Sequence, residues 1–300
     1  MIRAILYATL LAFLFASCGS ETSNNGEIVI PNDTNKKDTA QFVDSQVTDV
    51  IQSFSSPVEM SALIKDAGAK FNGKLLLPTN NADDYTTAYK QSLALGMLGV
   101  DLGYLNMYNK TTQIVNFVTI IKKLSDAMSV GQFFDFETLK RLATNNENVD
   151  SLLYISTNSF NLMDDHLRNN GRANLSALIV AGVWLEGEYI ASQVIKEVKN
   201  KAIEERIGEQ KVVLSEICLL LQHYSKDDKF LMQVSQEFES LRAEYANVRI
   251  IVEKKEAKMI MTPNGPVFEP DEVTHIEMTE EQLKNITNKT EQIRNKLISL

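Results

Sequence analysis

The chain has 300 residues, of which 44% are hydrophobic and 23% are charged. Gly and Pro number only 13 and 6, which argues against a disordered, collagen-like or loop-rich all-β protein. Acidic residues outnumber basic ones by 39 to 30, for a net charge of -9, and this disfavours binding to nucleic acid through a broad basic face. Two cysteines are too few for a disulfide scaffold.

The N-terminal segment has the pattern of a secretory signal peptide. Arg3 is the only charged residue before Cys18, and the apolar run over residues 5–15 is shorter than the roughly 20 residues that span a bilayer. The run ends in Phe15-Ala-Ser-Cys18, which resembles a bacterial lipobox with Phe15 where Leu is usual. We expect residues 1–17 to be removed and Cys18 to be the site of lipid attachment, palmitate included. The alternative is an ordinary signal peptide with an incidental cysteine.

The next stretch, residues 18–40, is small and polar, which predicts a flexible tether ahead of a single helical domain over residues 41–300. Gly19 stands where the enterobacterial signal for inner-membrane retention has Asp, so we expect a lipid-anchored location at the outer membrane, on either face. Asp38-Thr-Ala40 resembles the three-residue sequence at which Bacteroidetes attach O-glycans to exported proteins. Thr39 is therefore a candidate O-glycosylation site, with a chance match as the alternative.

Helical periodicity dominates the chain after residue 41. Apolar residues recur every three or four positions, which predicts an all-α bundle of about eight to ten helices. A solenoid is the second choice, since the repeat spacing of a tetratricopeptide array is not visible. Thr279 and Gln282 form a capping box that opens the last helix. The earlier helices are expected over residues 56–68, 83–108, 111–128, 135–143, 149–167 and 173–198.

The C-terminal third predicts an antiparallel helical hairpin. One heptad seam covers residues 203–224 and a second covers 231–252, with a short charged link between them. Cys218 lies among apolar residues of the first seam, which indicates a buried small side chain rather than a reactive thiol. Residues 258–269 break the helical pattern around an Asn-Gly pair flanked by prolines, so we expect a small β-hairpin or an ordered loop there.

Two helices combine glycines with acidic residues on apolar faces. Gly96, Gly99 and Gly103 share one helix face, and each costs about 1 kcal/mol relative to Ala, so we expect another backbone to approach closely. Helical spacing surrounds Asp101 and Glu186 with apolar side chains. Burying a lone carboxylate costs several kcal/mol unless it is paired or protonated, so each should be buried with a hydrogen-bond partner.

These acids have two interpretations. In the simpler one they fix helix register through hydrogen bonds, and in the other they form a polar spot in a ligand-binding groove. The candidate residues for a ligand or buried polar site are Asp101, Tyr104, Trp184, Glu186, Glu188 and Tyr189.

The same two helices are where a resemblance to a known group of proteins lies. Leu98–Tyr108 and Gly182–Ala191 resemble stretches of uncharacterised helical lipoproteins of Bacteroidetes. The likeness covers roughly residues 80–225. It implies a lipoprotein in the cell envelope and implies no established activity.

The sequence offers few signals of catalysis. His166, His223 and His275 stand apart without metal-ligand spacing, and the chain has no G-x-S-x-G elbow, P-loop or G-x-G-x-x-G motif. We therefore predict no catalytic, cofactor-binding or metal-ligating residue. A hydrolase with a carboxylate pair is a third, weak option.

The favoured function is a non-enzymatic scaffold or partner-binding module. It would be held at the membrane by its N-terminal lipid, with an envelope protein as partner and no nucleic acid. The alternative is a small-molecule binding protein with its pocket between the helices at 83–108 and 173–198. An apolar cleft where Asp101, Trp184 and Glu186 converge would favour the alternative, whereas a filled core would favour the scaffold.

Overall fold

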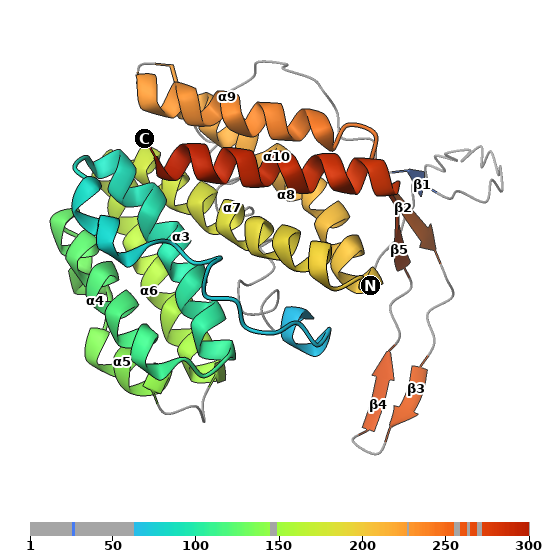
Figure 1. Cartoon of the computed structure of the whole chain (residues 1–300), viewed down its shortest axis with the longest axis horizontal. Helices are drawn as coiled ribbons and strands as arrows, with labels where there is room; N and C mark the ends of the chain where they lie inside the picture. The colour runs from blue at the N-terminus through green and yellow to red at the C-terminus, as the bar shows by residue number, and fades with distance from the viewer. Residues whose placement is uncertain are drawn as a thin grey trace, which may run out of the picture.

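The computed structural model describes residues 26–27, 63–144, 149–226, 228–254, 259–262, 265–268 and 272–299, and helices dominate these ranges (Figure 1). The prediction of an all-α bundle is confirmed. The expected lipid attachment at Cys18, the glycosylation site at Thr39 and the helix start near residue 56 lie outside the described residues. The helices are η1 Thr79–Asp84, α3 Ala88–Met107, α4 Thr111–Ala127, η2 Gly131–Phe133, α5 Phe136–Thr144, α6 Val149–Asn169, α7 Ala173–Glu197, α8 Lys201–Tyr224, α9 Lys229–Glu244 and α10 Glu280–Ile298.

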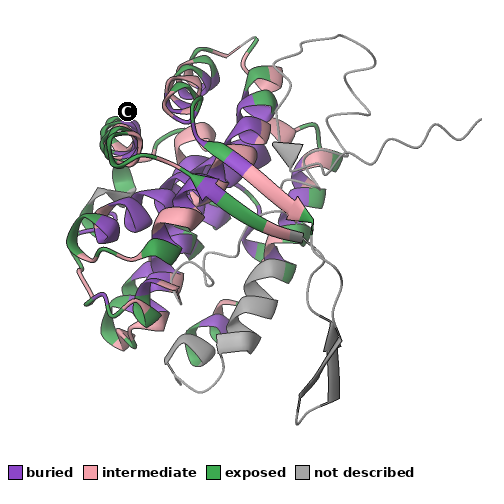
Figure 2. Cartoon of the chain, turned by 90° about the vertical axis from the view of Figure 1, so that its right-hand side faces the viewer, coloured by how far each residue is buried: buried purple, intermediate pink, exposed green. Residues whose placement is uncertain are grey.

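Helix α7 is the central element of the bundle. It packs against α3, α6, α8 and α10, and the buried residues gather along the helices in the middle of the molecule (Figure 2). Among the helices that the structure describes, α7 is the one long and apolar enough to cross a membrane, but 83% of its most apolar window is buried inside the protein. Its apolar surface is thus used for packing within the bundle.

Two glycines allow α3 and α7 to touch backbone to backbone. A Cβ atom on Gly96 would lie 2.1 Å from the carbonyl oxygen of Ile179, and one on Gly182 would lie 2.2 Å from that of Leu93. Both distances are far below van der Waals contact, so a side chain at either position would force the helices apart. The expected close approach is confirmed at Gly96, whereas Gly99 and Gly103 have nothing within 4 Å of such an atom.

Local signals set the ends of several helices. The capping box at the start of α10 is present, with both hydrogen bonds between Thr279 and Gln282 formed. Gly171 follows α6 with a φ of 67°, and the backbone N–H of Arg172 donates to Leu167 O at 2.7 Å. This left-handed residue closes the helix in the way that glycine permits.

The C-terminal helical hairpin is present but shorter than predicted. Helices α8 and α9 pack against each other, and Phe238, in the second seam, is fully buried. The expectation that this seam continues as a helix to Val252 is wrong, because α9 ends at Glu244 and residues 249–254 form a strand. Their apolar residues fit a strand as well as a helix, and pairing with a distant segment decides between the two.

Two small antiparallel sheets lie at one side of the bundle. One has the order β1 Gly26–Glu27, β2 Arg249–Lys254 and β5 Glu272–Glu277, and the other pairs β3 Met259–Thr262 with β4 Gly265–Phe268. The second pair confirms the small β-hairpin expected over residues 258–269. The first was not predicted, and its strand β1 lies within the segment expected to be a tether.

Candidate functional site

The strongest polar cluster of the core joins three helices. Asp101 of α3 and Glu186 of α7 have no exposed surface, and Arg294 of α10 is 4% exposed. Arg294 donates from Nη2 to Glu186 Oε1 at 2.7 Å and from Nε to Glu186 Oε2 at 3.0 Å, which makes a bidentate ion pair. Its Nη2 also donates to Leu75 O at 3.0 Å, while the N–H of Leu77 donates to Asp101 Oδ2 at 2.9 Å.

The cluster holds two acids and one cation, so one acid keeps its proton. Burial, and next the charge of Glu186, raise the pKa of Asp101 well above its usual range. Burial also raises the pKa of Glu186, but Arg294 opposes that rise. The two carboxyl groups act on each other, which raises the pKa of Asp101 and lowers that of Glu186, so a protonated Asp101 next to an ionised Glu186 is the favoured arrangement. Asp101 Oδ1 is buried and has no other hydrogen-bond partner among the described residues. Burial lowers the pKa of Arg294, but the Glu186 carboxylate raises it more.

Two of the predicted tyrosines lie near this cluster in different roles. Tyr189 is 7% exposed, and the guanidinium carbon of Arg294 lies 4.4 Å from its ring centroid, a cation–π contact. Tyr104 instead accepts a hydrogen bond from the N–H of Asn72 at 3.2 Å and stacks on Phe71 with ring centroids 5.5 Å apart. Tyr104 therefore holds the segment that contains Phe71 and Asn72 against α3.

Trp184 and Glu188 lie apart from the acid pair, in contact with α8 and the end of α9. Trp184 Nε1 donates to Gln210 Oε1 at 2.9 Å, and its ring centroid lies 5.8 Å from that of Phe238. Glu188 is 2% exposed and accepts a hydrogen bond from Tyr245 Oη at 2.8 Å. Two positions along a helix are about 200° apart, which is why Glu186 and Glu188 meet different neighbours.

Glu188 is buried beside a hydroxyl group rather than a cation. Burial raises its pKa from 4.5 to about 8, while the hydrogen bond from Tyr245 lowers it. Its second oxygen, Oε2, has no hydrogen-bond partner among the described residues. A neutral carboxylic acid is the favoured form in such a site.

The six predicted site residues therefore do not converge on one cleft. Asp101, Glu186 and Tyr189 meet around Arg294, Tyr104 joins an aromatic group beside the chain before α3, and Trp184 and Glu188 pack toward α8 and Tyr245. The expectation that both acids are buried with hydrogen-bond partners is confirmed.

Sequence reasoning missed the cation of the cluster. Arg294 stands between Ile293 and Leu297, two buried apolar residues of α10. Because Arg294 lies three residues before Leu297, its burial could have been predicted. Its partner could not, because Glu186 is 108 residues away and no local sequence pattern links the two. Tyr245 and Gln210, the partners of Glu188 and Trp184, were missed for the same reason.

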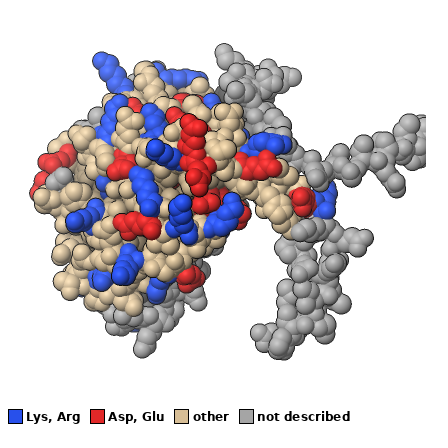
Figure 3. Space-filling model, turned by 45° about the vertical axis from the view of Figure 1, so that its right-hand side comes forward, with Lys and Arg blue, Asp and Glu red and all other residues tan. Residues whose placement is uncertain are grey.

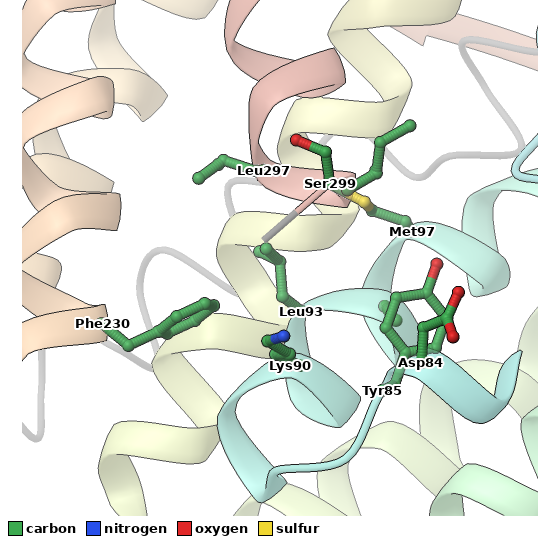
Figure 4. Close-up of a pocket in the computed structure, with 10 residues that line it drawn as sticks. Asp84, Tyr85, Lys90, Leu93, Met97, Phe230, Leu297 and Ser299 are labelled. Carbon is green, nitrogen blue, oxygen red and sulfur yellow. The ribbon is translucent and has the colours of Figure 1, made fainter. Parts of the chain in front are cut away.

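A pocket of about 230 Å³ opens next to the cluster (Figure 4). It lies between the start of α3, the start of α9 and the end of α10, and no residue of α7 lines it. The helices that were expected to enclose a pocket, 83–108 and 173–198, are instead in direct contact through Gly96 and Gly182. The lining residues are Asp84, Tyr85, Lys90, Leu93, Ala94, Met97, Phe230, Leu297, Ile298 and Ser299.

Tyr85 connects this pocket with the buried charges. Burial raises the pKa of Tyr85, and the charges of Arg294, Glu186 and Asp101 all act on it. Met97 lies one helical turn before Asp101, and Leu297 lies almost one turn after Arg294. The pocket is thus lined mainly by apolar side chains, together with Asp84, Lys90 and the phenol of Tyr85.

Within the part of the chain that the structure describes, no three His, Cys, Asp or Glu side chains are grouped so that they could hold a metal ion. The buried Cys218 has its pKa raised by burial, as a structural thiol would. Searches with family models, against curated proteins and against solved structures found no match to this chain.

Proposed function

We propose that this chain is a lipid-anchored protein of the cell envelope, whose helical domain is a non-enzymatic scaffold or partner-binding module. The observation that favours this interpretation is the buried Arg294–Glu186 ion pair next to Asp101. Of the two acids that suggested a ligand groove, Glu186 of α7 binds Arg294 of α10, and Asp101 of α3 lies beside this ion pair and accepts from the N–H of Leu77. A buried ion pair that joins helices in this way fixes their register.

The exposed face seen in Figure 3 fits such a module. Basic and acidic side chains are interspersed on it rather than gathered by sign. Several of them pair across elements, such as Lys196 of α7 with Glu291 of α10 at 2.6 Å and Lys296 of α10 with Glu237 of α9. Mixed charges keep a surface soluble and are compatible with a specific protein partner.

The anchor is tested by changing Cys18 in cells that process lipoproteins. Cys18→Ala removes the acceptor thiol, so the protein should lose its acyl chains and leave the membrane fraction. Mass spectrometry of the mature N-terminal peptide and fractionation measure the two effects. A wild-type protein that is exported without lipid would contradict the anchor, and Cys218→Ala is the matched control, since that thiol is buried.

The partner is tested by cross-linking the native protein in intact membranes. A recurrent envelope protein, cross-linked at defined surface lysines, supports the module. Co-purification of a stoichiometric small molecule without a protein partner would instead favour the second candidate.

That second candidate is a small-molecule binding protein, and the pocket of Figure 4 is the specific observation in its favour. Ala94→Leu would fill the pocket from its α3 wall, so a ligand released from the purified protein and added back should no longer raise the melting temperature. Ala243→Leu, on the exposed side of α9, is the matched control. An unchanged ligand-induced shift in Ala94→Leu would exclude this pocket as the site.

A further inference from the structure

The pocket of Figure 4 carries one positive and one negative side chain that the buried cluster does not use. Lys90, in the first turn of α3, is half-buried, and Asp84, at the end of η1, is exposed. Neither Lys90 nor Asp84 forms an ion pair with another of the residues that the structure describes. Both charges are therefore available to a bound molecule.

The walls of the pocket are largely apolar. Leu93, Ala94 and Met97 of α3 and Leu297 of α10 are buried, and they favour a hydrocarbon group over a further charge. At roughly 30 Å³ for a water molecule in the liquid, the volume of about 230 Å³ has room for about eight groups of that size. The pocket thus suits a small molecule and is too small for a lipid with two long acyl chains.

Contacts outside the pocket hold its walls in place. The backbone of α3 lies against α7, where a Cβ atom on Gly182 would be 2.2 Å from the carbonyl oxygen of Leu93. The ring of Phe230, on another side of the pocket, stacks on Tyr89 with centroids 6.2 Å apart. A preformed site loses less free energy to ordering when a ligand binds, which favours binding of a small molecule.

The two charges select among small apolar molecules. Lys90 attracts a carboxylate and repels an ammonium group, whereas Asp84 does the reverse. A fatty acid would satisfy Lys90 alone, and an apolar amine would satisfy Asp84 alone. A molecule that carries both groups next to one hydrocarbon side chain matches both charges and the apolar walls.

We propose that this pocket binds a zwitterionic α-amino acid with an apolar side chain, such as leucine, isoleucine, methionine or phenylalanine. Lys90 binds its carboxylate and Asp84 binds its ammonium group, while its side chain lies against Leu93, Met97 and Leu297. This inference rests on the second candidate function, the binding of a small molecule in this pocket, and names the chemical class of the ligand.

The ligand class is tested by isothermal titration calorimetry of the full Cys18→Ala protein. This protein is isolated without detergent, because detergent tails could enter the pocket. The probes are the four amino acids, each with a matched acid that lacks the ammonium group and a matched amine that lacks the carboxylate. For leucine these are isocaproate and isoamylamine. At least one amino acid should bind at least tenfold more tightly than its matched acid and its matched amine.

Two substitutions connect this preference to the two charged side chains. Asp84→Asn should weaken binding of the amino acid at least tenfold but not that of the matched acid, and Lys90→Met should spare the matched amine instead. Asp83→Asn, at an exposed acid paired with Lys123, and Lys65→Met, at an exposed lysine, are the matched controls and should change no affinity. A general loss of structure would not shift the preference in opposite directions, and circular dichroism checks that each variant is folded.

The contrary outcomes separate the ligand class from the pocket itself. A matched acid or amine that binds as tightly as the amino acid, and no longer binds to Ala94→Leu, overturns the zwitterion but keeps the pocket as a small-molecule site. Binding that Ala94→Leu leaves unchanged overturns both. If none of the probes binds, the amino-acid ligand is overturned, whereas the second candidate function still stands or falls with a co-purified ligand.

Discussion

At the residue scale, Arg294 is the group on which the buried acids depend. It is the cation in hydrogen-bond contact with Glu186, and its charge also lowers the pKa of Asp101, against the larger effect of burial. Removing one member of a buried ion pair leaves the other charge buried and uncompensated. Replacing a carboxyl group that is already protonated removes no charge and so costs little.

We therefore predict opposite outcomes for two substitutions in the same cluster. Arg294→Met should lower the free energy of unfolding by about 3–5 kcal/mol, because Glu186 is left buried and unpaired. Asp101→Asn should cost about 1 kcal/mol or less, because an amide can donate to Glu186 and accept from the N–H of Leu77 as the protonated acid does. Urea unfolding of both variants measures the difference. Equal losses would mean that Asp101 is ionised in the folded protein.

Glu188 predicts a distinct dependence of stability on pH. Its folded pKa is about 8 against an ordinary 4.5, so the folded state holds a proton that the unfolded state has lost between these values. More protons bound in the folded state means that stability falls as pH rises through this window and levels off above it.

Glu188→Gln should abolish this pH dependence of stability, because glutamine does not ionise. Its side-chain oxygen can still accept the hydrogen bond from Tyr245. The variant should gain stability over the wild type progressively from about pH 4.5 to about pH 8, with little further gain above. Thermal unfolding of both proteins across this pH range measures the difference in their stability. Because both proteins contain Asp101, its contribution to the pH dependence cancels in that difference. A constant difference at all pH values would show that Glu188 does not titrate in the folded protein.

At the element scale, the α3–α7 contact depends on individual glycines. Gly96 lies where a Cβ atom would strike the backbone of α7, whereas Gly99 is exposed and has free space around it. The two are one helical turn apart in the same helix, which makes them a matched pair.

Gly96→Ala should destabilise the fold by separating the helices, while Gly99→Ala should stabilise it by up to about 1 kcal/mol through helix propensity alone. The melting temperatures of the two variants should therefore move in opposite directions. A stabilising Gly96→Ala would mean that α3 and α7 do not touch there.

The α8–α9 hairpin is tested at Phe238, which is fully buried against Trp184. Phe238→Ala removes a buried ring and should cost about 3–5 kcal/mol in a reversible urea melt. A loss below about 1 kcal/mol would place this seam on the surface. Met232→Ala, an exposed apolar position of the same helix, is the control.

The sequence predicted elements whose signals are local. Thr279 with Gln282 marks a helix start within one turn, and the sequence analysis recognised it. Strand β2 was mistaken for helix because its partner β5 begins at residue 272, beyond the reach of periodicity. The buried acids were recognised from their own helices, but Arg294 was not, since only the tertiary fold brings it to Glu186.

At the scale of the whole molecule, α7 couples the two halves of the bundle. It contacts α3, α6, α8 and α10. Elements that share a central helix unfold together more readily than elements joined by a linker.

Thermal unfolding should therefore be one cooperative transition, reported at the same temperature by Trp184 fluorescence and by helical circular dichroism. Arg294→Met should lower the midpoint temperature by the same amount in both measurements. Two separate transitions, or a Trp184 signal that is unaffected by Arg294→Met, would contradict the single helical domain.

The position of Arg294 in the last helix has a consequence for how the protein is made. Arg294 and Leu75, joined by a hydrogen bond, are separated by 219 residues. A nascent chain that has yet to synthesise α10 holds Asp101 and Glu186 without this cation, and burying both is then costly. We therefore expect α3 and α7 to reach their final packing only once α10 supplies this cation.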